Sequence, residues 1–191
     1  MIAGLVLAAG LSRRMGRPKL LLSLDGKPLV RWSAEALVPH VDALYVVVPP
    51  DDRALREAMA GLAVKLVVNR TPEAGQGTSI AAGVAGLPAD AEAVVITLGD
   101  QPRLPEGLVA AVIAAWRREG KPIAAPVFRG TQGTPVVFGA SVFAELRALD
   151  GDAGARTVVR TDPARVATLA VDAPMPPDVD TPEDYARLHV Q

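Results

Sequence analysis

Short apolar runs rich in valine and isoleucine recur along the chain. Apolar residues follow one another in these runs with little alternation, which is typical of parallel strands that are buried on both faces of a sheet. We therefore expect each run to form a strand. The runs are Ile2–Leu7, Leu44–Val48, Val64–Val68, Val94–Leu98, Ile123–Val127 and Val136–Phe138.

Segments with the apolar spacing of helices lie between these runs. Each follows a residue that can begin a helix: Asp51 or Asp52 as an N-cap, Pro105 in a first turn, and Ser141. Strands that alternate with helices predict a three-layer α/β/α sandwich with a mostly parallel, Rossmann-like sheet. No linker divides the chain, so we expect a single domain over residues 1–191. The apolar stripes are Leu55, Met59 and Leu62; Leu108, Val112 and Trp116; and Val142, Leu146 and Leu149.

The composition limits the chemistry that this domain can perform. It has two histidines and no cysteine, which excludes a disulfide, a thiol nucleophile and a cysteine-bound zinc, and argues against imidazole catalysis. We expect His40 and His189 to have surface or packing roles. The net charge of −1 gives no electrostatic attraction for nucleic acid or a membrane surface. Carboxylates, lysine, arginine and backbone amides must therefore carry any chemistry.

The apolar start of the chain differs from an export signal in the order of its charges. A signal peptide carries positive charges before its apolar run, whereas Arg13 and Arg14 follow the run 2–11. That run is also too short to cross a bilayer. Together with the absence of cysteine, this predicts a cytoplasmic protein with neither membrane nor nucleic-acid partners.

The loop that follows the first apolar run, from Leu7 to Lys19, has the residues of a polyphosphate site. It combines two glycines, three arginines and a lysine, and ligands of open α/β sheets bind beyond the carboxyl ends of the strands. The spacing of Gly10 and Gly16, with Leu20 after the lysine, fits neither a Walker A loop nor the dinucleotide-binding fingerprint. From these residues alone, the loop could also be a solvated turn whose arginines face water.

Three aspartates lie where a magnesium ion could bind. Asp100 comes directly after the fourth apolar run and fits equally a turn or a Mg²⁺ ligand. The last helix is expected to begin with Thr181 as its N-cap and Asp184 closing a capping box. That helix start does not explain Asp178 and Asp180, which precede it and alternate as residues do at the end of a strand.

Two glycine-rich segments have equally open interpretations. In Asn69–Ile80, a turn leads into a helix with hydroxyl residues near its start, which suits either an anion site or a helix cap. In Gly151–Arg156, Asp152 suits a helix N-cap and Arg156 suits an anion contact at a helix start.

The first loop contains the pattern Leu7-Ala8-Ala9-Gly10-x-Ser12-x-Arg14-Met15-Gly16-x-Pro18-Lys19. This pattern resembles the signature of the MobA-like nucleotidyltransferases and is most similar to their molybdenum cofactor cytidylyltransferase branch. The resemblance implies the nucleotide-diphospho-sugar transferase fold and a loop that wraps a nucleoside triphosphate. It makes Arg14 and Lys19 the catalytic residues, with Lys19 stabilising charge at the α-phosphate. It assigns substrate binding to Leu7, Ala8, Ala9, Gly10 and Ser12.

The same resemblance implies a Mg²⁺ ion and names its ligands. The Gly-Asp-x-Pro motif makes Asp100 the first ligand. The Asp-x-Asp-Thr-Pro element near the end of the chain adds a second carboxylate, with Asp180 favoured over Asp178.

Two further segments resemble the family's nucleotide-base loop and its acceptor side. Many relatives carry Gly-His-Pro where this chain has Gly-Thr-Pro, so Thr134 leaves the identity of the acceptor open. Arg156 would bind an anionic group of that acceptor. The residues implied for the base and ribose are Asn69, Gly75, Gln76 and Ser79.

The resemblance implies transfer of a nucleoside monophosphate to a terminal phosphate, with release of pyrophosphate. The run 16–22 is closer to the cytidylyl branch, which favours CTP and a molybdopterin-type acceptor, with a molybdoenzyme or its maturation factor as a candidate protein partner. Residues 1–102 would bind the nucleotide and residues 103–191 the acceptor. The alternatives are GTP, another phosphorylated acceptor such as a sugar phosphate, or a non-catalytic cofactor-binding or chaperone module.

Overall fold

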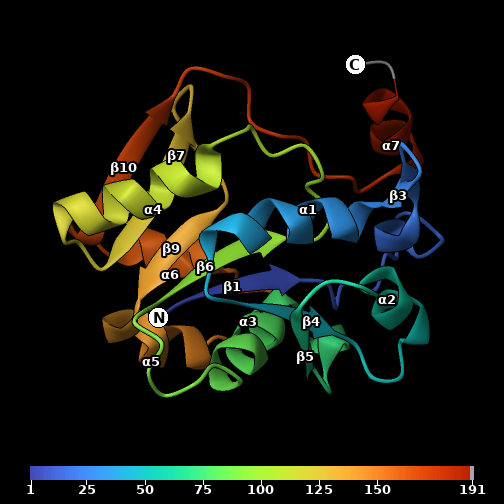
Figure 1. Ribbon diagram of the computed structural model, residues 1–191, viewed down its shortest axis with the longest axis horizontal. Helices are drawn as coiled ribbons and strands as arrows, with labels where there is room; N and C mark the ends of the chain where they lie inside the picture. The colour runs from blue at the N-terminus through green and yellow to red at the C-terminus, as the bar shows by residue number, and fades with distance from the viewer. Residues whose placement is uncertain (190–191) are drawn as a thin grey trace.

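A computed structural model describes residues 1–189, and it has the three layers that the sequence predicts (Figure 1). Residues 190 and 191, the end of the predicted acceptor part, lie outside the described residues. The strands of the main sheet are β1 (Ile2–Leu7), β4 (Ala43–Val48), β5 (Val64–Val68), β6 (Ala93–Leu98), β7 (Ile123–Phe128), β8 (Thr131–Gln132), β9 (Val136–Gly139) and β10 (Val166–Val171). A separate small hairpin pairs β2 (Ser23–Leu24) with β3 (Lys27–Pro28).

The main sheet has the strand order β10-β7-β9-β6-β1-β4-β5, and β8 pairs with β7. β6, β1, β4 and β5 are parallel, as are β10 and β7. β9 lies antiparallel between β6 and β7, so the sheet is mostly parallel, as predicted, but β9 itself does not follow the expected direction. A strand that is buried on both faces needs a continuous apolar run whichever way it points, so the pattern alone does not fix the direction.

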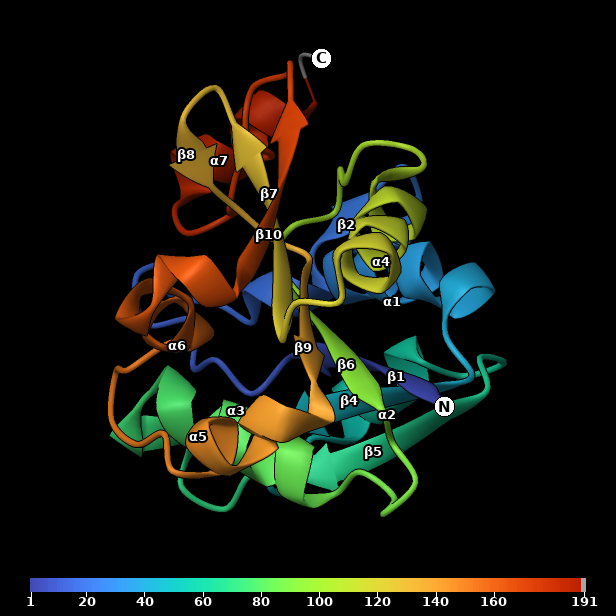
Figure 2. The same cartoon turned by 90° about the vertical axis from the view of Figure 1, so that its left-hand side faces the viewer.

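Helices cover both faces of this sheet (Figure 2). The helices α1, α2 and α4 pack on one face, and α3, α5 and α6 pack on the other. A third apolar cluster at the end of the sheet joins α7 to the first loop and to the hairpin through Met15, Leu24, Leu29, Val179 and Leu188. The helices are α1 (Leu29–Leu37), α2 (Arg53–Ala58), α3 (Gln76–Ala85), α4 (Leu108–Glu119), α5 (Phe143–Arg147), α6 (Ala155–Thr161) and α7 (Pro182–Leu188).

Two helices begin where the sequence predicts, and two do not. Asp52 caps α2, and the capping box of Thr181 and Asp184 begins α7, as predicted. Pro105 is not in the first turn of α4, because Gly107 takes a left-handed conformation (φ 72°) and the helix begins only after it. Asp152 does not cap α6, because the N-cap is Gly154 and the helix begins at Ala155.

Strand ends and helix ends also differ from the apolar pattern. Leu62 and Leu149 lie beyond α2 and α5, which end at Ala58 and Arg147. Asp178 and Asp180 are in a loop and not at the end of a strand. The strand β10 was not predicted, because only part of it is buried and its exposed residues interrupt the apolar run.

The carboxyl ends of β1 and β6 are held close together, and the last loop is attached to them. The backbone N–H of Gly99 donates to Leu7 at 3.0 Å, and a Cβ atom on Gly99 would lie 3.0 Å from the same carbonyl oxygen. The N–H of Val179 donates to the carbonyl of Asp100 at 3.1 Å. These bonds bring the first loop, the end of β6 and residues 178–180 to one edge of the sheet.

None of the helices within residues 1–189 combines the length and the apolarity that a membrane crossing requires.

Candidate active site

A cavity of about 450 Å³ opens at the carboxyl edge of β1 and β6. Its wall comes from five parts of the chain: the loop after β1, residues 72–79, the end of β6, Asp152 and residues 178–180. Most of the predicted site residues therefore meet in one place. Those that line the cavity are Leu7, Ala9, Gly10, Ser12, Arg14, Lys19, Gly75, Gln76, Ser79, Asp100, Asp178 and Asp180.

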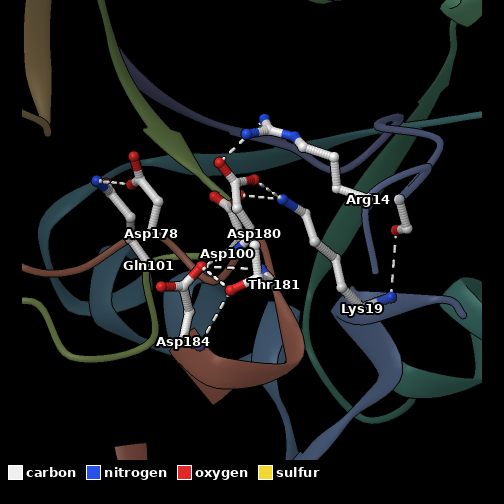
Figure 3. A network of polar contacts seen from close by, with 9 residues as sticks. Arg14, Lys19, Asp100, Gln101, Asp178, Asp180, Thr181 and Asp184 are labelled. Atoms are coloured by element: carbon white, nitrogen blue, oxygen red, sulfur yellow. Dashed lines mark hydrogen bonds and ion pairs between the residues drawn. The ribbon is translucent and has the colours of Figure 1, made fainter. Parts of the chain in front are cut away.

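Lys19 lies at the centre of an ion-pair network in this cavity (Figure 3). Its Nζ atom is 2.6 Å from Oδ2 of Asp100 and 2.8 Å from Oδ1 of Asp180. The guanidinium of Arg14 contacts the other oxygen of Asp180 at 3.0 Å. The backbone of Lys19 is fixed as well, because its N–H donates to Oγ of Ser12 at 3.2 Å. The two predicted catalytic cations are thus in direct contact with two of the three predicted metal carboxylates, Asp100 and Asp180.

The two carboxylates keep Lys19 charged. Burial lowers the pKa of the Lys19 ammonium, but the charge and hydrogen bond of Asp100, together with those of Asp180, outweigh this effect and raise the pKa above its ordinary value. The side chain of Lys19 is only 12% exposed and that of Asp100 only 14%, so little water screens the pair. A fixed positive charge with little solvent is well suited to stabilise a phosphate whose charge increases during reaction.

Asp178 faces the same cavity without contacting a cation. Its Oδ1 atom accepts a hydrogen bond from Nε2 of Gln101 at 2.6 Å. Although much of the residue is exposed, its carboxyl group lies against the buried Gln101. Burial of this group and the charge of Asp100 raise the pKa of Asp178 above its ordinary value, and the hydrogen bond from Gln101 only partly opposes them.

These aspartates offer the oxygen ligands that a hard divalent cation prefers. In the part of the chain that the structure describes, no three Asp, Glu or His side chains are already arranged as a metal cluster, and the ammonium of Lys19 lies between Asp100 and Asp180. The raised pKa of Asp178 comes first from burial of its carboxyl group and then from the negative charge of Asp100. The donor set therefore fits Mg²⁺ or a similar ion.

Residues 72–79, which include the first turn of α3, form another part of the cavity wall, and Asn69 supports this part through hydrogen bonds. Asn69 is buried, and its amide donates to Thr78 Oγ1 at 2.9 Å and to Ser79 Oγ at 3.0 Å. Gly75 has a φ of 121°, and a Cβ atom there would lie 2.3 Å from the carbonyl oxygen of Gly151. Asn69 itself does not line the described cavity, so it shapes this wall without facing the ligand space.

Three other predicted residues also lie outside the lining of the described cavity. Ala8 is buried, and its N–H donates to Val47 at 2.8 Å, which fixes the start of the loop. Thr134 donates from its hydroxyl group to Oε1 of Gln101. Arg156 is exposed on α6.

Some residues of the site were not predicted from the sequence. Leu11, Arg13, Glu73 and Asp152 also line the cavity. Leu11 and Arg13 stand directly beside predicted residues of the first loop, whereas Glu73 and Asp152 do not. Gln101 was treated as a spacer in the Gly-Asp-x-Pro motif. Its burial among polar partners depends on segments distant in the chain, so no local signal could have identified it.

Comparison with known proteins explains this arrangement of residues. The family model of the MobA-like NTP transferase domain matches residues 4–167. The chain belongs to this family. It is 32% identical to the purine catabolism protein PucB of Bacillus subtilis, over 96% of this chain and 94% of PucB. It is 35% identical to the molybdenum cofactor guanylyltransferase of Rhodobacter capsulatus, over 97% of this chain and 94% of that one.

Solved structures agree with the family assignment. The crystal structure of Rv0371c from Mycobacterium tuberculosis superposes with a TM-score of 0.89 at 32% identity, over 100% of this chain and 99% of the other. The manganese complex of Rv0371c gives a TM-score of 0.84 at 31% identity, over 98% and 97% of the two chains. The protein is therefore a nucleotidyltransferase with the nucleotide-diphospho-sugar transferase fold, which confirms the predicted family and fold.

The raised pKa of Asp178 predicts a pH-dependent effect of Asp178→Asn on stability. The folded protein keeps the proton of Asp178 to higher pH than the unfolded chain does. Asp178 therefore lowers the free energy of unfolding as the pH rises from 3.8, the ordinary pKa of the group, through its raised pKa in the folded state. The variant lacks this titration and should be more stable than the wild type at pH 7. Urea unfolding between pH 3 and pH 7 measures the difference.

The advantage of the Asp178→Asn variant should disappear towards pH 3, where the carboxyl group is protonated in both states. Asp172→Asn is the matched control, because the Asp172 side chain is fully exposed, and it should change stability little at any pH. Equal stability of the wild type and Asp178→Asn across the whole range would contradict the described surroundings of Asp178.

Proposed function

We propose that this nucleotidyltransferase transfers a nucleoside monophosphate, with CMP from CTP favoured, to the terminal phosphate of a molybdopterin-type acceptor in a Mg²⁺-dependent reaction. The observation that carries the proposal is the contact of Lys19 with Asp100 and Asp180 at the mouth of the first loop. This contact supports a role for Lys19 at the α-phosphate and a role for the two carboxylates as metal ligands. The likeness of the chain to a molybdenum cofactor guanylyltransferase supports the class of acceptor.

In this reaction, an oxygen of the acceptor phosphate forms a bond to the α-phosphorus of the nucleotide. The bond from that phosphorus to the bridging oxygen breaks, and pyrophosphate leaves with the electron pair. Lys19 and Arg14 supply positive charge to the phosphate oxygens. The main contributions of the protein are position and charge, so no side-chain nucleophile is required.

Asp100, with Asp180 or Asp178, would hold the divalent cation. When bound, this ion supplies charge neutralisation to the phosphate oxygens. Asp180 has two cationic partners in the structure, Lys19 and Arg14, whereas Asp178 has none among its described contacts. With the carboxylates holding the cation, the ammonium of Lys19 would be available to bind the substrate. The manganese complex of Rv0371c supports a divalent cation in this fold.

The part of the cavity wall formed by residues 72–79 would bind the base and the ribose through Gly75, Gln76 and Ser79. Asn69 would hold this wall in place through its bonds to Thr78 and Ser79. CTP is favoured by the run 16–22, while the guanylyltransferase of Rhodobacter capsulatus makes GTP the second candidate.

The remaining predictions concern the acceptor and its delivery. Residues 1–102 would bind the nucleotide and residues 103–191 the acceptor, with Thr134 and Arg156 on the acceptor side. A molybdoenzyme or its maturation factor would receive the product. A sugar phosphate is the alternative acceptor. A non-catalytic cofactor-binding module is disfavoured, because such a module has no need for Lys19 in contact with two carboxylates.

Lys19→Met should reduce the rate of pyrophosphate release by about 100-fold or more, which is the usual effect of removing a charge that is aimed at the transition state. Asp100→Asn should have a comparable effect, through loss of a metal ligand. A coupled pyrophosphate assay with each nucleotide measures both. Lys65→Met is the matched control, because Lys65 is exposed on β5 outside the described cavity and should leave the rate unchanged. Unchanged rates in both site variants would refute the mechanism.

A substrate screen tests the choice of nucleotide and acceptor. The four nucleoside triphosphates are combined with Mg²⁺ and with either a molybdopterin-type or a sugar-phosphate acceptor. We expect CTP with the molybdopterin-type acceptor to give the highest kcat/KM. Preference for GTP would change the proposed nucleotide but not the proposed acceptor. Preference for a sugar phosphate would change the proposed acceptor but not the nucleotide. Failure of all four nucleotides to bind would support the non-catalytic alternative.

A further inference from the structure

Gln101 is a buried polar residue that lies between Asp178 and Thr134. Its side chain and backbone are 4% exposed together, and it follows Asp100 at the end of β6. The hydroxyl of Ser33 in α1 donates to its carbonyl oxygen at 3.2 Å. The N–H of Gln101 donates to the carbonyl of Leu98 at 3.4 Å. The backbone of this residue is therefore fixed from both sides.

The side chain of Gln101 forms the middle of a hydrogen-bonded chain. Its Nε2 atom donates to Asp178 at 2.6 Å, and its Oε1 atom accepts from the hydroxyl group of Thr134. The direction of these hydrogen bonds follows from Asp178, because an ionised carboxylate only accepts hydrogen bonds. The amide group must therefore face Asp178, the amide oxygen must face Thr134, and Thr134 must be the donor.

The orientation of the Asp178 side chain depends on these hydrogen bonds more than that of Asp100 or Asp180 does. Within residues 1–189, Asp100 and Asp180 are each held by the ammonium of Lys19, whereas the hydrogen bond recorded for the Asp178 side chain comes from Gln101. The loop around Asp178 is attached by the next residue, through the bond from Val179 to Asp100. The direction of the Asp178 carboxylate is thus set by an amide whose own direction is set by Thr134.

We propose that Thr134 and Gln101 are positioning residues that orient the Asp178 carboxylate in the cavity. The hydroxyl of Thr134 fixes the Gln101 amide, and the amide directs Asp178 towards the place where a divalent cation would bind. This inference rests on the proposed function, because the cation that Asp178 would bind is used in that reaction. It gives Thr134 a role that requires no contact between its side chain and the acceptor.

Substitutions of Thr134 show what its hydroxyl group contributes to these hydrogen bonds. Without the hydroxyl of Thr134, the buried amide oxygen of Gln101 loses its donor, and the amide can turn so that its oxygen faces Asp178. Two acceptors would then face each other, and the carboxylate would move away. A serine keeps the donor, whereas a valine keeps the shape of threonine and removes it.

Mn²⁺ binding, followed by electron paramagnetic resonance with no nucleotide present, tests the proposal directly. Thr134→Val should weaken Mn²⁺ binding by about 3- to 10-fold, which corresponds to the loss of one hydrogen bond. Thr134→Ser should restore most of the wild-type affinity. In the Asp178→Asn background, adding Thr134→Val should cause no further loss, because the two residues act through one chain. Thr131→Val, on the exposed strand β8, is the matched control and should bind as the wild type does.

Steady-state kinetics on the same variants provides a second measurement. Thr134→Val should lower kcat at limiting metal in proportion to its effect on Mn²⁺ affinity, and Thr134→Ser should restore it. A rise in the KM for the acceptor that Thr134→Ser does not rescue would overturn the proposal and favour direct contact between Thr134 and the acceptor.

Three further outcomes separate this proposal from the proposed function. Wild-type Mn²⁺ affinity in Thr134→Val would overturn the positioning role, and pyrophosphate release by the same protein would leave the proposed function standing. Equal loss in Thr134→Val and Thr134→Ser would also overturn it, since the hydroxyl group would then not be the cause. A wild-type protein that binds Mn²⁺ with the expected variant pattern, but releases no pyrophosphate with any nucleotide, would support the positioning role and refute the proposed function.

Discussion

The ammonium group of Lys19 joins three parts of the chain that are far apart in sequence. It contacts Asp100 after β6 and Asp180 before α7, and its own backbone is held by Ser12 in the first loop. A lysine that loses most of its water is stable only with nearby negative charge, and a carboxylate in the same place needs a cation. This mutual requirement fixes the geometry of the site.

The fold places these charges where they can meet. Parallel pairing of β1 and β6 puts the first loop beside Asp100, and the bond from Val179 to Asp100 adds the last loop. The net charge of −1 therefore conceals a local separation, with cations in the first loop and carboxylates in two others. Phosphoryl-type transfer needs this separation, and it loses nothing from the absence of cysteine and the scarcity of histidine.

Local patterns predicted the parts of this structure that depend on neighbouring residues. The apolar runs located the central strands, and the capping box of Thr181 and Asp184 located α7. The direction of β9 and the half-buried strand β10 depend on pairing with distant strands, which no local pattern contains. Likewise, the first loop and Asp100 were found by their motif, whereas the role of Gln101 arises only when β6 meets the loops that carry its partners.

The proposed reaction moves a nucleoside monophosphate to a phosphorylated acceptor. It can be followed with CTP labelled with ³²P at the α-phosphate, supplied together with Mg²⁺ and a molybdopterin-type acceptor, and with separation of the products. We expect the label to move to the acceptor while an equal amount of unlabelled pyrophosphate is released. A label that stays on free CDP or CMP, with none on the acceptor, would refute the proposed transfer.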